Sequence, residues 1–357
     1  MDRTSTDKVS GVKRWSRLAM KSAALSVAGI VLVGCQNNPV EPPEETAVQG
    51  NAQPAESQAE SLDYSPGKVI NLPASVDRLD DLESIGNVLA VQSGSSLLVG
   101  SISDIARDKA EKIDLREGCA DLNAADGAFY MGCGGSYLEV PAEDPASFRF
   151  AEVDAEFPIT SATRLSSGEL VLASQHKDEV AVVEDDKVVE DFRIGAPTDQ
   201  LLAVPNANAP DGVVRTWNAD TTIQNVDWKN SRPGGRLRVG VGLGQADVGS
   251  NGVVLVSDTG GKRLAVYTSS DVVRLHQFGN TAGTPWAVAW DSSRELAWVT
   301  STDINVAEAF DISTGQPISK GTFDTVSDAQ FITALDDGTI VVGSVDGRLH
   351  VVKDPEI

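Results

Sequence analysis

Four aspartates in this sequence have the type and placement suited to binding a hard cation, because each lies near the start of a short apolar run. They are Asp121, Asp199, Asp247 and Asp328. Carboxylate oxygens are the ligands that Ca²⁺ prefers. If the fold brings these side chains together, they could hold a calcium ion. If it does not, they are solvated turn residues, since aspartate is common in turns. Both interpretations stay open.

Other catalytic chemistry has little support in the sequence. A Ser-His-Asp hydrolase needs a histidine beside its nucleophile, but His176, His276 and His350 are far apart and no Gly-x-Ser-x-Gly turn accompanies them. The segment Gly240–Gly244 is rich in glycine, yet it lacks the strand–loop–helix context of a phosphate-binding loop. We interpret it as a connection between repeats and assign no catalytic or cofactor-binding residue.

Cys119 and Cys133 flank the hairpin signal Asp126-Gly127. A three-residue loop, Ala125–Gly127, would set Cys119 opposite Cys133, whereas a two-residue loop would set it opposite Gly134. We therefore predict a disulfide, with a reactive thiol pair as the alternative. A zinc site is disfavoured because structural zinc needs about four nitrogen or sulfur ligands and no histidine lies nearby.

The elements that must position these residues are short apolar strands separated by Gly, Asp, Asn and Ser turns, which is typical of all-β proteins. One phrase recurs with a period of about 40 residues. It consists of a polar turn, an apolar strand that ends on a small residue, a second turn and another apolar strand. Its seven copies are Ser95–Ser101, Asp126–Cys133, Ser167–Ser174, Asp211–Trp217, Asn251–Asp258, Arg294–Ser301 and Asp337–Ser344.

These copies predict a seven-bladed β-propeller in which each copy supplies the second and third strands of a four-stranded blade. The fifth copy, continued to Tyr267, resembles an NHL repeat, and the sixth is similar to YVTN-type repeats. A β-sandwich or a parallel β-helix would also contain many short strands, but neither predicts this period and copy number. Trp286, Trp290 and Trp298 alternate around a strand turn in the predicted sixth blade. For them we favour packing between blades over a carbohydrate-binding platform.

The last copy leaves room for only three strands, which would expose an unpaired edge. The apolar segment Lys68–Leu72 precedes the first copy and has no blade of its own. We predict that it pairs with Leu349–Lys353 and closes the ring.

The N-terminus has the layout of an export signal, with a basic segment followed by the uncharged run Ser22–Gly34. The run is too short for a permanent membrane helix. Leu32–Cys35 resembles the lipobox of bacterial lipoproteins, which implies cleavage before Cys35 and lipid attachment to it. An ordinary secretory signal with an incidental cysteine is the alternative. Lys13-Arg14 leaves twin-arginine export open beside the general secretory route.

We therefore divide the chain into a signal peptide (1–34), a lipidated cysteine with a disordered acidic linker (35–65) and the propeller (66–357). The linker has no Lys or Arg between residues 36 and 65 and is rich in Pro, Glu, Gln, Ala and Ser, a composition that buries too little apolar surface to fold. Cleavage leaves 23 basic and 50 acidic residues, a net charge of −27. This charge disfavours nucleic acid as a partner and leaves membrane attachment to the lipid.

Over its whole length the layout of lipobox, acidic linker and seven atypical repeats resembles the LppL group of lipoproteins from mycobacteria and corynebacteria. The resemblance implies a lipoprotein on the extracytoplasmic face of the cell membrane and supplies no catalytic residue. We expect a binding or scaffold module with a protein or envelope component as partner, since propellers offer rigid loop-built faces. The alternative is a metal-assisted, lactonase-like hydrolase that uses channel carboxylates.

Overall fold

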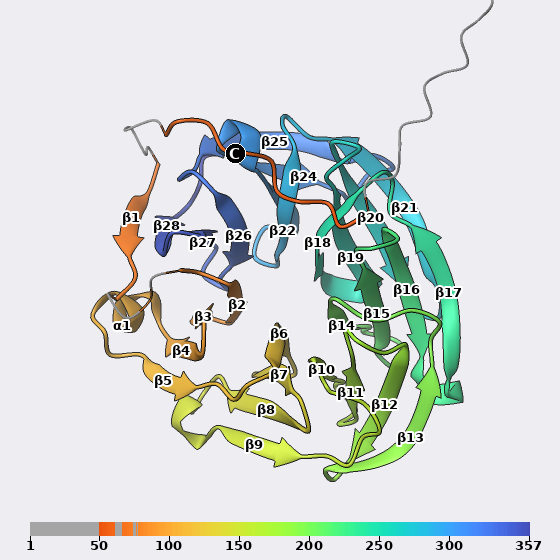
Figure 1. Ribbon diagram of the computed structural model, residues 1–357. Helices are drawn as coiled ribbons and strands as arrows, with labels where there is room; N and C mark the ends of the chain where they lie inside the picture. The colour runs from red at the N-terminus through yellow and green to blue at the C-terminus, as the bar shows by residue number, and fades with distance from the viewer. Residues whose placement is uncertain (1–49, 61–65, 74–75, 77) are drawn as a thin grey trace, which may run out of the picture. The chain divides into compact units, whose positions relative to one another are not determined.

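Seven four-stranded antiparallel sheets form a closed β-propeller in the computed structural model (Figure 1). The structure describes residues 50–60, 66–73, 76 and 78–357. Within each blade, four strands follow one another from the channel to the rim. The predicted all-β, seven-bladed propeller is therefore confirmed.

Blades one to four follow one another along the chain, and the first strand of each is the innermost. Blade one contains β2 (Asp81–Ile85), β3 (Val88–Ser93), β4 (Ser96–Gly100) and β5 (Glu111–Asp114). Blade two contains β6 (Cys119–Ala125), β7 (Ala128–Cys133), β8 (Ser136–Pro141) and β9 (Arg149–Glu152). Blade three contains β10 (Ser161–Arg164), β11 (Leu170–Ala173), β12 (Glu179–Glu184) and β13 (Lys187–Arg193). Blade four contains β14 (Leu201–Val204), β15 (Gly212–Trp217), β16 (Thr222–Asp227) and β17 (Arg232–Arg238).

The remaining blades complete the ring. Blade five contains β18 (Leu243–Val248), β19 (Val253–Asp258), β20 (Arg263–Ser269) and β21 (Val273–Asn280). Blade six contains β22 (Pro285–Asp291), β23 (Leu296–Ser301), β24 (Val306–Asp311) and β25 (Ile318–Asp324). Blade seven contains β26 (Ala329–Ala334), β27 (Ile340–Ser344), β28 (Arg348–Val352) and β1 (Lys68–Asn71). The helical turns are α1 (Ile102–Ala106), η1 (Pro145–Ser147), η2 (Trp228–Asn230), η3 (Ser250–Gly252) and η4 (Thr302–Ile304).

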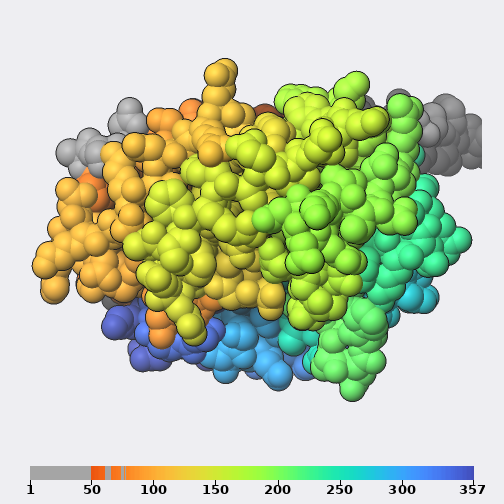
Figure 2. All heavy atoms as spheres, turned by 90° about the horizontal axis from the view of Figure 1, so that it is seen from below, coloured from red at the N-terminus to blue at the C-terminus, as the bar shows by residue number. Residues whose placement is uncertain are grey.

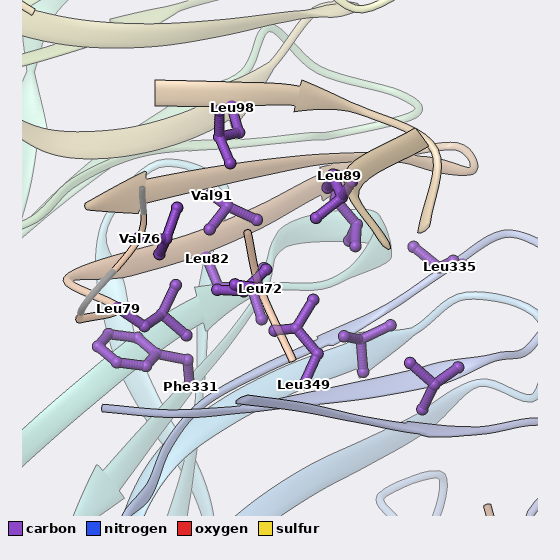
Figure 3. Close-up of a cluster of buried hydrophobic side chains, with 13 residues drawn as sticks. Leu72, Val76, Leu79, Leu82, Leu89, Val91, Leu98, Phe331, Leu335 and Leu349 are labelled. Atoms are coloured by element: carbon purple, nitrogen blue, oxygen red, sulfur yellow. The ribbon is translucent and has the colours of Figure 1, made fainter. Parts of the chain in front are cut away.

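Apolar packing between blades holds the ring together. The buried side chains of the described residues form seven clusters, and each joins two neighbouring blades. The cluster between blades seven and one contains Leu82, Leu89 and Leu349 (Figure 3). Second strands such as β7 and β11 are buried along their whole length because neighbouring blades cover both faces. The side view shows the blades of the first half of the ring packed side by side (Figure 2).

The ring closes through β1 and β28, as predicted. These strands pair antiparallel, with Lys68 opposite Val351 and Asn71 opposite Arg348. The N-terminal strand therefore supplies the outer edge of a blade whose other strands come from the C-terminus, so opening the ring requires breaking this sheet.

The repeat assignment was wrong by one strand in blade one. The copy Ser95–Ser101 forms β4, the third strand, and the second strand is β3. The other six copies contain second strands, as predicted. Blade one misleads because turns containing Gly86 and Gly94, both with positive φ, precede two successive apolar strands.

Cys119 and Cys133 form the predicted disulfide, but by a different register. Ala125 pairs with Ala128, so the hairpin has the two-residue loop Asp126-Gly127, in which both residues have positive φ. With this two-residue loop and a regular strand, Cys119 would lie opposite Gly134 instead of Cys133. An irregularity in β6 between Ala120 and Asn123 restores the register and places Cys119 opposite Cys133.

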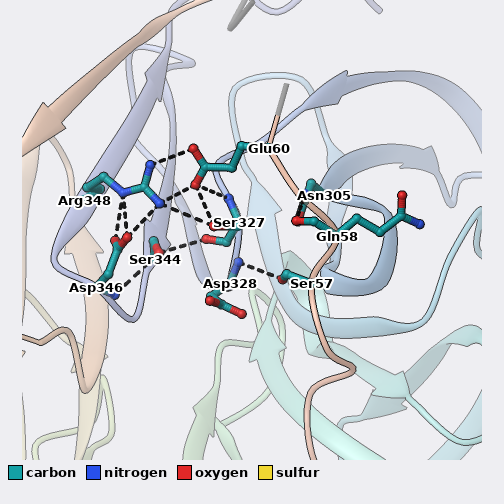
Figure 4. Close-up of polar contacts among 9 residues, drawn as sticks. All are labelled: Ser57, Gln58, Glu60, Asn305, Ser327, Asp328, Ser344, Asp346 and Arg348. Atoms are coloured by element: carbon teal, nitrogen blue, oxygen red, sulfur yellow. Dashed lines mark hydrogen bonds and ion pairs between the residues drawn. The ribbon is translucent and has the colours of Figure 1, made fainter. Parts of the chain in front are cut away.

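Residues 50–60, which we call the strap, differ from the disorder predicted for residues 35–65. Ala52 is buried, and the amide of Asn51 donates to the carbonyl of Asn218 in blade four. At the other end, the carboxylate of Glu60 pairs with Arg348 of blade seven and accepts hydrogen bonds from Ser327 (Figure 4). The composition predicts disorder because the strap has no apolar face to bury. Polar contacts hold it in place instead.

Between its ends the strap makes further polar contacts. Ser57 accepts a hydrogen bond from the amide of Asp328 at 2.8 Å, and the carbonyl of Gln58 accepts one from the side chain of Asn305 at 3.0 Å (Figure 4). The strap therefore connects blade four to blades six and seven along one face of the propeller, as its orange-red trace shows in Figure 1.

The predicted signal peptide, residues 1–34, and Cys35 lie outside the described residues, as do residues 36–49 and 61–65 of the predicted linker. Among the residues that are described, no helix has the length and apolar character needed to cross a membrane.

Candidate functional site

The inner strands of all seven blades surround a central channel with a cavity of about 460 Å³. Seven carboxylates line it, and no Lys, Arg or His does so among the described residues. The acidic residues are Asp80, Asp81, Glu83, Asp121, Asp199, Asp247 and Asp336. Such a concentration of one charge sign in a cleft focuses the electrostatic field and attracts cations.

Three of the four aspartates singled out from the sequence line this channel: Asp121, Asp199 and Asp247. Asp328 does not; its backbone amide instead holds the strap through Ser57. Sequence reasoning missed Asp81 and Glu83 of β2. The shifted repeat assignment in blade one took β3 as the inner strand, so the two carboxylates of β2 were left out of the channel.

Backbone amides of other blades hold several channel carboxylates in place. Asp81 accepts from the amide of Leu122 in blade two at 3.3 Å. Asp247 accepts from the amide of Trp290 in blade six at 2.7 Å. These contacts join the edges of adjacent inner strands, which otherwise lack sheet partners toward the channel. The two aspartates therefore position the channel wall.

Asp121 makes a longer connection, from blade two to blade four. Its carboxylate accepts a hydrogen bond from the amide of Leu201 at 3.1 Å and another from the side chain of Asn123 at 3.0 Å. Asp121 has positive φ and lies within the irregularity of β6. The irregularity that places Cys119 opposite Cys133 therefore includes Asp121, whose carboxylate connects blade two to blade four.

Glu83 differs from these aspartates because it receives no hydrogen bond and forms no ion pair with any described residue. In β2 the side chains alternate. Leu82 packs into the cluster shared with blade seven, and Ser84 contacts Thr333 of that blade, whereas Asp81 accepts from blade two. Glu83 shares the side of Asp81 and faces the channel.

Burial raises the pKa values of the channel carboxyls above the ordinary range. The pKa of Asp121 rises to about 7, and those of Asp81 and Asp247 rise to about 6, chiefly because burial penalises the charged form. Burial also raises the pKa of Glu83 well above its usual value, and the charges of Asp247, Asp81 and Asp121 raise it further. A bound cation would favour the ionised forms of these carboxyls and lower their pKa values.

The described residues contain no group of three or more His, Cys, Asp or Glu side chains arranged to hold a metal ion. The channel carboxylates are distributed over the inner wall rather than gathered at one point. His176, His276 and His350 lie in blades three, five and seven and do not line the channel. The calcium site considered from the sequence is therefore not assembled by these residues.

The three tryptophans of blade six all pack against clusters that join neighbouring blades. Trp298 is fully buried in the cluster that blades six and seven share, as expected for packing between blades, and its ring lies 5.4 Å from that of Phe323 in its own blade. Trp286 and Trp290 are partly buried against the clusters that blade six shares with blades seven and five, and they also line the channel. The segment Gly240–Gly244 spans the connection from β17 to β18, as predicted, and two of its amides donate to Asp258.

No protein family and no curated protein matches this sequence. Similar solved structures are a chain of the mitotic checkpoint complex (TM-score 0.61, 11% identity, 84% of this chain and 96% of that one) and streptogramin B lyase (0.62, 9%, 80% and 96%). The WD40 β-propeller domain of Doa1 is also similar (0.56, 14%, 81% and 97%). These similarities support the propeller fold. The resemblance to LppL-type lipoproteins stays an expectation.

Proposed function

We propose that this protein is a lipoprotein anchored on the extracytoplasmic face of the cell membrane, and that its propeller is a binding module of the envelope. The observation that supports a binding role most directly is the acid-lined channel of about 460 Å³, a size typical of small-molecule sites. Polar and aromatic side chains meet there on a rigid ring. No specific observation favours the metal-assisted hydrolase, so we derive no reaction step.

The proposed anchor is a lipid on Cys35. Only residues 36–49 separate it from the strap, and a fully extended chain of that length spans about 50 Å. Because the strap docks on one face of the propeller, the effective tether is much shorter than a disordered linker that ends at residue 65. The proposal therefore keeps the propeller close to the membrane.

The anchor is tested by mass spectrometry of the protein isolated from the membranes of a lipoprotein-processing bacterium. The expected N-terminus is an acylated Cys35, and the Cys35→Ala variant should lose the acyl mass and leave the membrane fraction. An unmodified Cys35 in a protein cleaved elsewhere would contradict the proposed anchor.

The binding role is tested by native mass spectrometry of the full mature protein after incubation with a small-molecule extract of the envelope. We expect a bound species, and we expect less of it with Glu83→Gln than with Glu156→Gln, which removes an exposed carboxylate outside the channel. If both variants retain the bound molecule equally, the channel is not its binding site. Crosslinking in native membranes with wild-type protein and Cys35→Ala tests for a macromolecular partner.

A further inference from the structure

We infer that the channel binds an extended organic cation that presents ammonium groups, such as a linear polyamine, with Glu83 as its central contact. This inference rests on the proposed function, because it takes the channel as the binding site and specifies the chemistry of the ligand.

The charge distribution of the wall defines the class of ligand. Carboxylates of blades one, two and five, Asp81, Glu83, Asp121 and Asp247, line the channel, and no basic side chain among the described residues neutralises them there. The described residues form no group of three or more such side chains that could hold a single metal ion. A chain with several ammonium groups can contact carboxylates of more than one blade.

Unpartnered polar side chains provide a second, independent observation. Glu83 has no donor from the described protein, although Asp81, Asp121 and Asp247 each accept at least two hydrogen bonds. Thr163 of β10 is only 1% exposed and lines the channel, yet its hydroxyl has no hydrogen-bond partner among the described residues. An ammonium group carries three donors and no acceptor, which complements a free carboxylate and a free hydroxyl oxygen.

Aromatic side chains favour an organic cation over a bare metal ion. Trp286 and Trp290 line the same cavity, and tryptophan faces attract ammonium groups while its edges pack against methylene chains. A metal ion would need several ligands at one point, and the described residues provide no such group. The mixture of dispersed carboxylates and indole rings fits an aliphatic chain that carries positive charges.

The test is isothermal titration calorimetry of the full mature protein at pH 7.5 and low salt, with spermidine as the first probe. A lysine oligopeptide and calcium chloride are the second and third probes. We expect spermidine to bind with one site per chain and Glu83→Gln to weaken it by about tenfold or more, the usual effect of losing a charged hydrogen bond. Thr163→Val should weaken binding by a smaller factor, and Glu156→Gln should leave it unchanged.

Circular dichroism and thermal melts of the variants establish that each one is folded. Binding of the lysine peptide with the same dependence on Glu83 would identify the ligand as a protein side chain that carries an ammonium group. Binding of calcium alone, absence of binding by both ammonium probes, or equal spermidine affinity of wild type and Glu83→Gln would overturn the inference. If an envelope ligand is still retained through the channel in that case, the proposed binding role survives and only the ligand class is wrong.

Discussion

Glu83 of blade one and Asp247 of blade five interact across the channel, because the charge of Asp247 raises the pKa of Glu83. Asp247 is held by the amides of Val248 and Trp290, whereas Glu83 has no donor among the described residues. One carboxylate thus positions the wall and the other is available to a ligand. A cation between them would relieve their repulsion and allow both to ionise.

The raised pKa values of the channel carboxyls predict that their contribution to the free energy of unfolding falls as pH rises from about 4 to about 7. The unfolded chain releases its carboxyl protons near the ordinary value of 3.8, whereas folded Asp121 keeps its proton until about pH 7. The folded state therefore binds more protons in this window, and its advantage is lost as pH rises. For Asp121 alone, this difference corresponds to roughly 4 kcal/mol of unfolding free energy. Chemical denaturation across this pH range measures the effect.

Glu83→Gln isolates the contribution of the channel, since Glu83 has no donor to lose among the described residues. The variant should flatten the fall in stability, and Glu156→Gln should not. The buried His350 acts in the opposite direction, because burial lowers its pKa and its protonation favours unfolding below about pH 6.5. An identical pH dependence of stability in Glu83→Gln and wild type would contradict a buried carboxyl at this position.

The disulfide should contribute stability without contributing to binding. Replacing Cys119 and Cys133 by serine removes a cross-link over 14 residues of sequence, and we expect a loss of about 2 to 4 kcal/mol of unfolding free energy. The affinity for any channel ligand should stay within a factor of about two of the wild type. A large loss of binding by the folded double variant would mean that the cysteines shape the channel through the nearby Asp121.

Ring closure is tested at Leu72, which follows β1 and is 7% exposed in the cluster between blades seven and one. Leu72→Ala should lower the unfolding free energy by about 2 to 5 kcal/mol, the usual range for a buried leucine. The matched control is Leu275→Ala on the outer strand β21, where the side chain is 44% exposed. Thermal melts should show a clear shift for the first variant only. Similar melting temperatures would show that the closing segment contributes little.

The strap should detach when Glu60 is removed. Glu60 pairs with Arg348 and accepts from Ser327, and both charged side chains are largely shielded from water, at 20% and 21% exposed. Glu60→Ala should therefore increase hydrogen exchange in residues 50–60, while Glu56→Ala, at an exposed position, should not. The propeller strands should keep their protection in both variants. If hydrogen exchange of residues 50–60 is unchanged in Glu60→Ala, the strap is held by its backbone contacts and Ser57 rather than by Glu60.

The propeller could be predicted because nearly every blade repeats one local signal, a polar turn followed by a mostly apolar second strand. The closing pair β1 and β28 could be predicted because an apolar segment and an incomplete blade remained at opposite ends of the sequence. The docking of the strap could not be predicted in this way. It depends on polar contacts between residues 288 positions apart, Glu60 and Arg348, and its composition is that of a disordered chain.

The channel site was predicted only in part, because the repeat was assigned one strand too late in blade one. Asp121 and Asp247 begin or lie within inner strands that the repeat places correctly, whereas Glu83 lies in the one blade where a second turn imitates the repeat. The disulfide was predicted through a three-residue loop, but a two-residue loop and an irregularity between Ala120 and Asn123 give the same pairing. Local turn signals do not contain the compensating irregularity, which includes Asp121, a residue that accepts a hydrogen bond from Leu201 of blade four, far along the chain.

The central claim is that the acidic channel is a binding site for an ammonium ligand. It is tested most directly by a crystal structure of the mature protein grown with spermidine at pH 7.5. We predict density along the channel, with an ammonium nitrogen within hydrogen-bond distance of Glu83 and the chain against Trp286 or Trp290. Spermidine bound only on the outer surface, with solvent filling the channel, would contradict the claim.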